Sequence, residues 1–274
     1  MSRIAAIQMA SGPQVQANLM AAGKLIKKAV EEGAELIVLP EGFAIMGIHE
    51  TDRLAIAEEE GKGAIQDWAS SLAKQYGVWL IAGTIPLKTA DPKKSTASSL
   101  VYDAQGKQVA RYDKIHLFDV TVEENDETHV ESATTQAGDK PLVIDTPVGK
   151  VGLAICYDLR FPEMFRQMVR DGAEIFVTPS AFTKATGKAH WEILLRTRAI
   201  ENLCYVVAAN QGGYHVNGRE TYGHSMIVDH WGNVHRLIEK GTGVISMDID
   251  LNVLSATRKN FPVLKHCKSW TLSK

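Results

Sequence analysis

Three ionisable side chains stand where apolar segments of the chain end, and their types suit hydrolytic chemistry. Glu41 follows ELIVLP, Lys114 lies within RYDKIHL, and Cys156 follows VGLAI. A cysteine thiol has a pKa of about 8.5, so at neutral pH it needs a base or a positive charge to become a nucleophile. Glu41 is a candidate base. Lys114 is a candidate for lowering the thiol pKa and for stabilising an oxyanion.

Cys156 also lies at a predicted joint between a strand and a helix. The apolar run 151–155 indicates a strand, and Pro162 stands near the first turn of a helix predicted over 161–172. The backbone N–H of Tyr157 is therefore expected at a helix N-terminus, where it donates to negative charge. An isolated cysteine at the end of a strand is more often an inert core residue. The catalytic interpretation depends on the three ionisable residues occurring together.

The framework that must bring these residues together is predicted from alternating strand and helix patterns. The strand patterns cover 3–10, 34–42, 78–86, 173–181 and 204–213, and the helix patterns cover 15–33, 63–77, 161–172 and 190–202. Hairpins are predicted over 98–117 and 141–156, and a closing β-meander over 223–251. A long loop without structure is predicted over 118–139. In open α/β sheets, strand ends at one edge meet at a crevice, so the site is expected there. The chain is predicted to be one α/β domain over 1–274, with a C-terminal tail (255–274) involved in subunit contact.

The composition argues against several classes of function. Of the 274 residues, 45% are hydrophobic and 23% charged, which is ordinary for a soluble globular protein. A net charge of −2 with scattered Lys and Arg gives no footprint for nucleic acid. No apolar run approaches the roughly 20 residues that span a bilayer, and no signal peptide is recognised, so we expect no membrane partner and a cytoplasmic location. Cys156, Cys204 and Cys267 lack CxxC spacing, which argues against disulfides and zinc–thiolate sites.

Three blocks of sequence resemble the signatures of one enzyme family. LIVLPEGF, RYDKIHLFD and GLAICYDLRFPEMFR are similar, in this order, to the signature blocks of the nitrilase (carbon–nitrogen hydrolase) superfamily. The similarity continues through HWEILLRTRAIENLCYVVAANQ and GHSMIVDHWGNV, so it covers nearly the whole chain. The resemblance implies an α-β-β-α four-layer sandwich with a pair of mixed sheets. It also implies that subunits associate into a larger sandwich, as a homodimer or higher homo-oligomer.

The same resemblance assigns roles to the site residues. It implies a catalytic triad of Glu41, Lys114 and Cys156, which hydrolyses a linear amide through a cysteine thioester. Glu131, in HVESATTQAGD, matches the family's second glutamate and is expected to orient Lys114 or the substrate nitrogen. Lys114 and the backbone N–H of Tyr157 are expected to hold the oxyanion. No metal, nucleotide or redox cofactor has a role in this scheme.

Shorter blocks narrow the expected substrate to a small-molecule amide. PEGFAIMG, CYDLRFPE and GRETYGHSMIVDHWG resemble most the deaminated glutathione amidase branch, which implies hydrolysis of deaminated glutathione to 2-oxoglutarate and cysteinylglycine, a metabolite-repair reaction. Because that substrate carries a carboxylate at each end, cations are expected in the pocket, and Arg160 is favoured since it stands four residues after Cys156. The other candidates are Lys184, Arg196 and Arg219 for carboxylates, and Phe118 and Phe182 as walls for the acyl group. A salt bridge is the competing interpretation for each basic residue.

Other functions stay open at this point. Within the superfamily, the alternatives are an ω-amidase acting on 2-oxoglutaramate or 2-oxosuccinamate and an N-carbamoyl amine hydrolase. A catalytically silent scaffold of the same fold is the alternative from another class, although a scaffold has no need of an ionisable trio at strand ends. A Cys–His dyad or a metal site is less well supported, because no pair of histidines has HExxH spacing.

Overall fold

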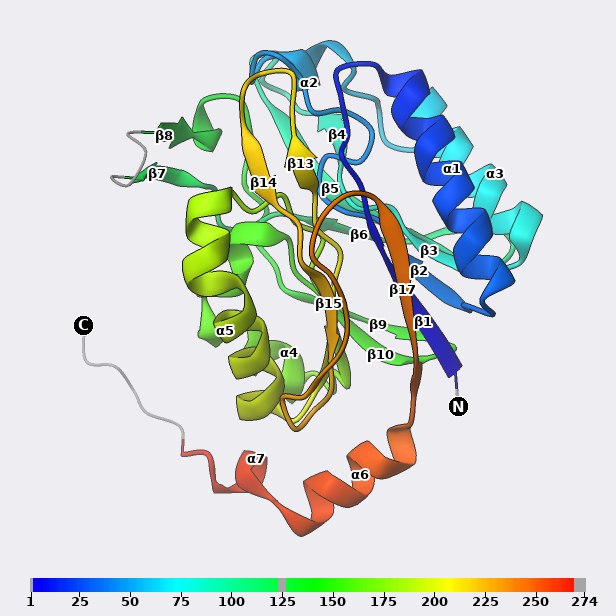
Figure 1. Ribbon diagram of the computed structural model, residues 1–274, viewed down its shortest axis with the longest axis vertical. Helices are drawn as coiled ribbons and strands as arrows, with labels where there is room; N and C mark the ends of the chain where they lie inside the picture. The colour runs from blue at the N-terminus through cyan, green and yellow to red at the C-terminus, as the bar shows by residue number, and fades with distance from the viewer. Residues whose placement is uncertain (1, 123–126, 269–274) are drawn as a thin grey trace.

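The computed structural model describes residues 2–122 and 127–268, and within them two mixed β-sheets pack face to face between two layers of helices (Figure 1). The first sheet has the order β17-β1-β2-β3-β5-β4, with β6 paired to β5. Its strands are β1 (Ser2–Gln8), β2 (Leu36–Val38), β3 (Trp79–Ile81), β4 (Ile85–Lys88), β5 (Ser95–Tyr102), β6 (Gln108–Asp113) and β17 (Gly243–Ile249). Helices α1 (Val15–Glu31) and α3 (Ala64–Tyr76) cover the outer face of this sheet.

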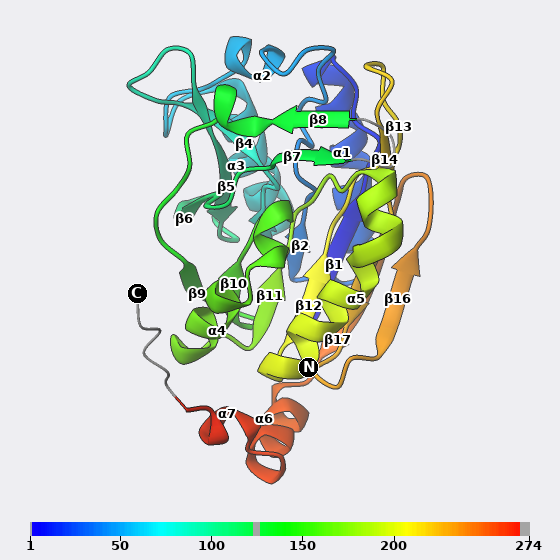
Figure 2. The same cartoon turned by 90° about the vertical axis from the view of Figure 1, so that its left-hand side faces the viewer.

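The second sheet has the order β16-β15-β12-β11-β10-β9. Its strands are β9 (Leu142–Thr146), β10 (Gly149–Leu153), β11 (Ile175–Val177), β12 (Tyr205–Ala208), β15 (Ser225–Val228) and β16 (Val234–Ile238). Helices α4 (Pro162–Arg170) and α5 (Lys184–Asn202) lie side by side over its outer face (Figure 2). The α-β-β-α layering predicted for the chain is confirmed.

Strand β1 explains why the sheets need continuously apolar strands. Ile4 and Ala6 face the second sheet and belong to the core between the sheets, whereas Ala5 and Ile7 belong to the core beneath α1 and α3. Side chains alternate across a strand, so a strand covered on both faces must be apolar at every position. These residues are fully buried. The two faces of β1 therefore contribute to two separate cores, one between the sheets and one beneath the helices.

The predicted strand over 78–86 is wrong in one respect, because it divides into β3 and β4 at Gly83. The backbone of Gly83 has φ +39°, and a Cβ there would lie 2.0 Å from the carbonyl oxygen of Pro40. Only glycine allows this approach. The turn places the hydroxyl of Thr84 where it accepts the backbone N–H of Gly42 at 2.8 Å. This contact holds the segment that carries Glu41.

Two further sequence predictions are corrected by the tertiary structure. The closing β-meander does not stay in one sheet, because β17 pairs antiparallel with β1, at the opposite end of the chain. The loop predicted over 118–139 contains the hairpin β7 (Asp119–Val122) and β8 (Glu127–Val130), followed by a 3₁₀ turn, Glu131–Ala133. Residues 123–126 of that loop lie outside the described residues. The two strands of this hairpin are close in sequence, but its acidic residues hide the alternation of apolar and polar side chains from which strands are predicted.

The remaining elements are short, apart from the C-terminal helix α6 (Leu251–Asn260). Strands β13 (Gly212–Tyr214) and β14 (Glu220–Tyr222) form a hairpin, α2 (Asp52–Ala55) is a single turn, and α7 (Val263–His266) follows α6. Helix α5 begins at Lys184 rather than at the predicted 190, because the hydroxyl of Thr183 caps it by accepting the N–H of Thr186. Of the predicted tail, 255–268 contains most of α6 and α7, and 269–274 lies outside the described residues.

Candidate active site

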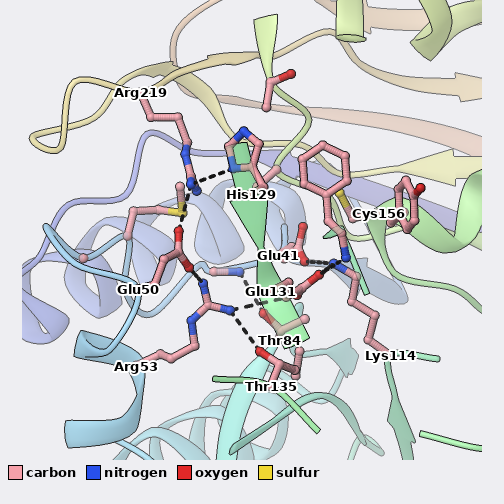
Figure 3. Close-up of a pocket in the computed structure, with 18 of the residues that line it drawn as sticks. Glu41, Glu50, Arg53, Thr84, Lys114, His129, Glu131, Thr135, Cys156 and Arg219 are labelled. Atoms are coloured by element: carbon pink, nitrogen blue, oxygen red, sulfur yellow. Dashed lines mark hydrogen bonds and ion pairs between the residues drawn. The ribbon is translucent and has the colours of Figure 1, made fainter. Parts of the chain in front are cut away.

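One pocket of about 500 Å³ contains the ionisable residues singled out from the sequence. Glu41, Lys114, Glu131 and Cys156 all line it, although they come from four separate segments of the chain. Figure 3 shows their side chains directed toward one another at one end of the pocket. The convergence expected at the strand ends is therefore present.

Cys156 follows β10 and begins the 3₁₀ segment Cys156–Arg160, which leads into α4. Its φ of 47° lies in the left-handed region, a strained conformation for a residue other than glycine and one that clusters at active sites. Its N–H donates to the carbonyl of Pro179 at 2.9 Å. The side chain is only 9% exposed. The predicted joint between strand and helix is thus a sharp turn that directs the thiol into the pocket.

Asp158 holds this turn in place. Its carboxylate accepts the N–H of Ile155 at 2.9 Å and the hydroxyl of Tyr112 at 2.7 Å, both inside the core. The other oxygen accepts the N–H of His116 at 2.9 Å and lies 2.7 Å from Nδ1 of the same residue. The aspartate has no exposed surface. One buried carboxylate therefore joins the turn at Cys156 to β6, which precedes Lys114.

Lys114 follows β6 and is buried between two carboxylates. Its Nζ lies 2.9 Å from Oε1 of Glu41, and 3.0 and 2.8 Å from Oε1 and Oε2 of Glu131. The side chain of Lys114 is 2% exposed, and those of Glu41 and Glu131 are 14% and 10% exposed. The backbone N–H of Phe118 donates to Oε2 of Glu131 at 2.7 Å and fixes that carboxylate. Two carboxylates and one ammonium give this cluster a formal charge of −1.

Burial and these neighbours displace two pKa values in the cluster. Burial lowers the pKa of Lys114, but Glu131 and Glu41 outweigh it and hold the pKa well above its ordinary value, so the amine stays charged. Burial raises the pKa of the Cys156 thiol, and Glu41 raises it further, whereas Lys114 lowers it. The net direction is upward. Lys114 lowers the thiol pKa as expected, but burial and Glu41 outweigh this effect, so the resting thiol is neutral.

An aromatic wall with one arginine flanks the cysteine. Phe118, Tyr157 and Phe182 line the pocket, and the rings of Phe118 and Tyr157 meet edge to face, 5.1 Å apart. The guanidinium of Arg160 lies 5.4 Å from the centre of the Phe182 ring and 5.7 Å from that of Tyr157. Its Nη1 lies 3.2 Å from Nδ1 of His190. Arg160 is thus held by ring faces beside Cys156, with its positive charge at the pocket.

Two of the predicted substrate-binding residues lie elsewhere. Lys184 is exposed and pairs with Glu220 at 2.8 Å, and Arg196 is exposed on α5 and pairs with Glu192 at 3.1 Å. Neither lines the pocket. Because their side chains extend from the surface into ion pairs, the salt-bridge interpretation holds for both residues, and we do not retain them as substrate ligands.

The pocket also contains residues that sequence reasoning missed. Arg53 and Glu50, from the segment around α2, and His129, from β8, line it together with the candidate Arg219. Thr84 joins them from the turn between β3 and β4. The segment around α2 has no strong periodic pattern, so only the arginine's charge hinted at a role for Arg53. These residues are brought in by loops that fold over the strand ends.

The chain belongs to the carbon–nitrogen hydrolase family, which it matches over residues 3–259. Among curated relatives, it is 41% identical over 266 residues to the deaminated glutathione amidase of Yersinia enterocolitica, covering 97% of this chain and 92% of that protein. The Caenorhabditis elegans NitFhit protein has a similar solved structure, with a TM-score of 0.92 and 38% identity; the match covers 99% of this chain and 66% of that longer chain.

A second solved structure has a modified cysteine in its active site. It is a glutamate-to-glutamine mutant of the amidase from Nesterenkonia sp. AN1, and acrylamide has added to its active site cysteine. The TM-score is 0.79 with 26% identity, and the match covers 96% of this chain and 98% of that chain. The family and the fold together define this chain as a hydrolase of carbon–nitrogen bonds other than peptide bonds. No helix among the described residues is both long and apolar enough to cross a membrane.

Proposed function

We propose that this protein is an amidase that hydrolyses deaminated glutathione to 2-oxoglutarate and cysteinylglycine, with Cys156 as nucleophile. The observation that carries the proposal is that one pocket holds the thiol of Cys156 together with Glu41, whose carboxylate is paired with the buried Lys114 at 2.9 Å. The relative from Yersinia enterocolitica, named for this reaction, supports the choice of substrate. The pocket supports it too, because it offers arginines for an amide with a carboxylate at each end.

In the first step, Glu41 takes the proton of Cys156 while Sγ attacks the amide carbon. The raised thiol pKa favours transfer at the moment of attack over a preformed thiolate. The carbonyl π electrons move to oxygen, and the oxyanion accepts hydrogen bonds from Lys114 and from the N–H of Tyr157. Once protonated, Glu41 attracts Lys114 less. The ammonium is then free to turn one N–H toward the oxyanion while Glu131 keeps holding it.

In the second step, the C–N bond breaks and a thioester forms. The electron pair of that bond goes to nitrogen, which takes the proton from Glu41, and cysteinylglycine leaves as the amine. Glu41, ionised again, then removes a proton from water as the water oxygen attacks the thioester carbon. The C–S bond breaks, the sulfur regains its proton from Glu41, and 2-oxoglutarate leaves. Glu41 thus acts as base, acid, base and acid in turn, which requires that it reach the thiol, the leaving nitrogen and the attacking water.

The acyl half of the substrate is placed against the aromatic wall. Arg160 supplies a cation there for the carboxylate of the 2-oxo acid, and Phe118 and Phe182 pack on its methylene groups. An arginine stacked on a ring keeps its edge available for a two-point contact with a carboxylate. This arrangement selects a short acyl group that ends in a carboxylate.

The test combines turnover with trapping of the acyl intermediate. Wild-type protein is expected to release cysteinylglycine from deaminated glutathione, and mass spectrometry of quenched enzyme should detect an acyl adduct on the peptide that contains Cys156. Cys156→Ala should abolish both, and Cys156→Ser should nearly abolish turnover because a hydroxyl is much harder to ionise. An active alanine variant would refute the mechanism. Release from 2-oxoglutaramate or N-carbamoylputrescine but not from deaminated glutathione would favour the alternative substrates, and no release from any of them would favour a silent scaffold.

We further infer that the chain is one cytoplasmic catalytic domain over 1–274 that assembles as a homodimer or higher homo-oligomer. Exposed apolar side chains on α5 and near α6 support assembly, namely Ile193, Ile200, Trp231 and Phe261. Large exposed apolar groups that lie together are typical of protein interfaces. Light scattering at micromolar concentration should give at least twice the monomer mass, and a monomer would contradict the inference.

A further inference from the structure

A second charged cluster lies in the same pocket, apart from the thiol. Arg53, in α2, and Arg219, from the β13–β14 hairpin, both contact Glu50 (Figure 3). Nη2 of Arg219 lies 2.8 Å from Oε1 of Glu50, and Nη2 of Arg53 pairs with the other oxygen. All three line the pocket. Residues separated by 169 positions are thus joined in one wall.

The charges of this cluster do not cancel. Burial raises the pKa of Glu50, but Arg53 and Arg219 outweigh burial and lower it, so the carboxylate is ionised at neutral pH. Two guanidinium groups then share one carboxylate, and the formal sum is +1. The cluster of Lys114 with its two glutamates has the opposite sum, −1. The two clusters adjoin, because Nη1 of Arg53 lies 3.9 Å from Oε1 of Glu131, and their formal charges offset; the excess positive charge lies at the two arginines and the excess negative charge beside Cys156.

The two arginines are rigidly positioned for binding. The amide of Asn217 donates to the carbonyl of Gly47 at 3.0 Å and its oxygen accepts the N–H of Arg219 at 3.0 Å, which ties the hairpin to the segment before α2. His215, buried at the base of the hairpin, hydrogen-bonds Ser11 at 2.8 Å. The two arginine side chains are partly exposed, 28% for Arg53 and 26% for Arg219. Partly exposed side chains remain accessible to a ligand. Because the fold already orders them, less conformational entropy is lost when the ligand binds.

The direction in which a bound amide must lie follows from the carboxylates. The amide N–H is a donor and its nitrogen later takes a proton, so the nitrogen must face Glu41. Glu131, on the other side of Lys114, is 3.9 Å from Nη1 of Arg53. The amine half of a substrate therefore extends past these glutamates toward Arg53, while the acyl half lies against the aromatic wall beside Arg160.

We propose that Arg53 and Arg219, held side by side by Glu50, bind the carboxylate that ends the amine half of the substrate. They thereby select amides whose leaving group is itself anionic over amides that release ammonia or a neutral amine. This inference rests on the proposed function and adds the origin of its specificity. Arginine suits the role because its fork of N–H donors matches a carboxylate at two points.

The test compares deaminated glutathione with its analogue in which the glycine carboxylate is a carboxamide. Both have the same scissile bond and the same acyl group, so the ratio of their kcat/KM values measures recognition of that one charge. We expect wild-type protein to favour the acid by roughly 10- to 100-fold, the size of one charge-assisted contact. In Arg219→Gln and Arg53→Gln the ratio should fall toward one, because kcat/KM falls more for the acid than for the carboxamide.

A ratio is independent of the fraction of folded enzyme, and the wild-type measurement needs no variant. Arg3→Gln is the matched control, because Arg3, near the start of β1, pairs with Asp248 of β17 at 2.7 Å and does not line the pocket. It should keep the wild-type ratio. Turnover of both substrates with a wild-type ratio near one, or an unchanged ratio in both pocket variants, overturns this inference alone. No turnover of either substrate by wild-type protein overturns the proposed function, and this inference with it.

Discussion

Both carboxylate oxygens of Glu131 contact Nζ of Lys114, at 3.0 and 2.8 Å, and the lysine side chain is almost fully buried. The same ammonium reaches Glu41 at 2.9 Å, so its three N–H groups are all engaged in the resting state. An oxyanion must therefore displace one of these contacts. In the proposed mechanism the contact with Glu41 is the one that weakens, because Glu41 takes the proton of the thiol and becomes neutral.

Replacing Glu41 by glutamine should separate thiol ionisation from catalysis. Glu41 raises the thiol pKa through its charge and its hydrogen bond, so in Glu41→Gln the pKa of Cys156 should fall. Turnover should nevertheless fall by about 10²- to 10⁴-fold, the usual contribution of a general base. The pH dependence of Cys156 alkylation, followed by mass spectrometry, gives the first quantity, and amine release gives the second. A variant with an unchanged thiol pKa would contradict the electrostatic part of this prediction.

In the wild-type protein, the rate of Cys156 alkylation should depend on pH as expected for a thiol with a raised pKa. Because its pKa is raised, the thiolate fraction of Cys156 is below that of an ordinary cysteine at every pH up to its own pKa. Alkylation by iodoacetamide should keep accelerating as pH rises past about 8.5, the ordinary value. A rate that reaches its plateau below neutral pH would indicate a preformed thiolate pair and would count against transfer of the proton during attack.

Removing the charge of Lys114 should destabilise the fold as well as stop turnover. Lys114→Met leaves two carboxylates buried without their cation, and breaking a buried pair in this way costs about 3–5 kcal/mol of the free energy of unfolding. Lys184→Met, which removes an exposed pair with Glu220, is the control and should cost about 1 kcal/mol or less. Urea unfolding measures both. Equal losses in the two variants would show that burial of the cluster contributes little.

Asp158 should prove to be a positioning residue for the nucleophile. In Asp158→Asn, an NH₂ group replaces one acceptor oxygen and faces donors such as the N–H of Ile155 and of His116. An unsatisfied buried donor costs about 1–3 kcal/mol, so the free energy of unfolding should fall by at least that much. Asp145→Asn, an exposed carboxylate paired only with Lys150, should change little.

Activity distinguishes this role from a purely structural one. If Asp158 sets the turn that presents Cys156, the folded variant should alkylate more slowly at Cys156 and lose kcat more than KM. Destabilised protein with normal alkylation and normal kcat per folded molecule would assign Asp158 to the core alone.

The local sequence was enough to predict much of this protein. Strand and helix patterns depend on residues a few positions apart, so α1 and α3 lie within the ranges predicted for them, and the apolar strands overlap theirs, although the range 78–86 divides at Gly83. The turn at Cys156 has its own signal, a strand that stops at a cysteine shortly before Pro162. The resemblance of three blocks to one family then predicted the layered fold, which the structure confirms.

Only the tertiary structure decided what the rest of the pocket contains. Arg53 and Arg219 meet at Glu50 because a hairpin from the C-terminal half folds over the segment around α2, and neither segment carries a pattern that records the other. Lys184 and Arg196 looked equally suitable by charge, yet both extend from the surface into ion pairs. Charge and spacing are local properties of a chain. The direction in which a side chain points into a shared cavity depends on packing between distant segments, and the sequence of either segment alone does not contain it.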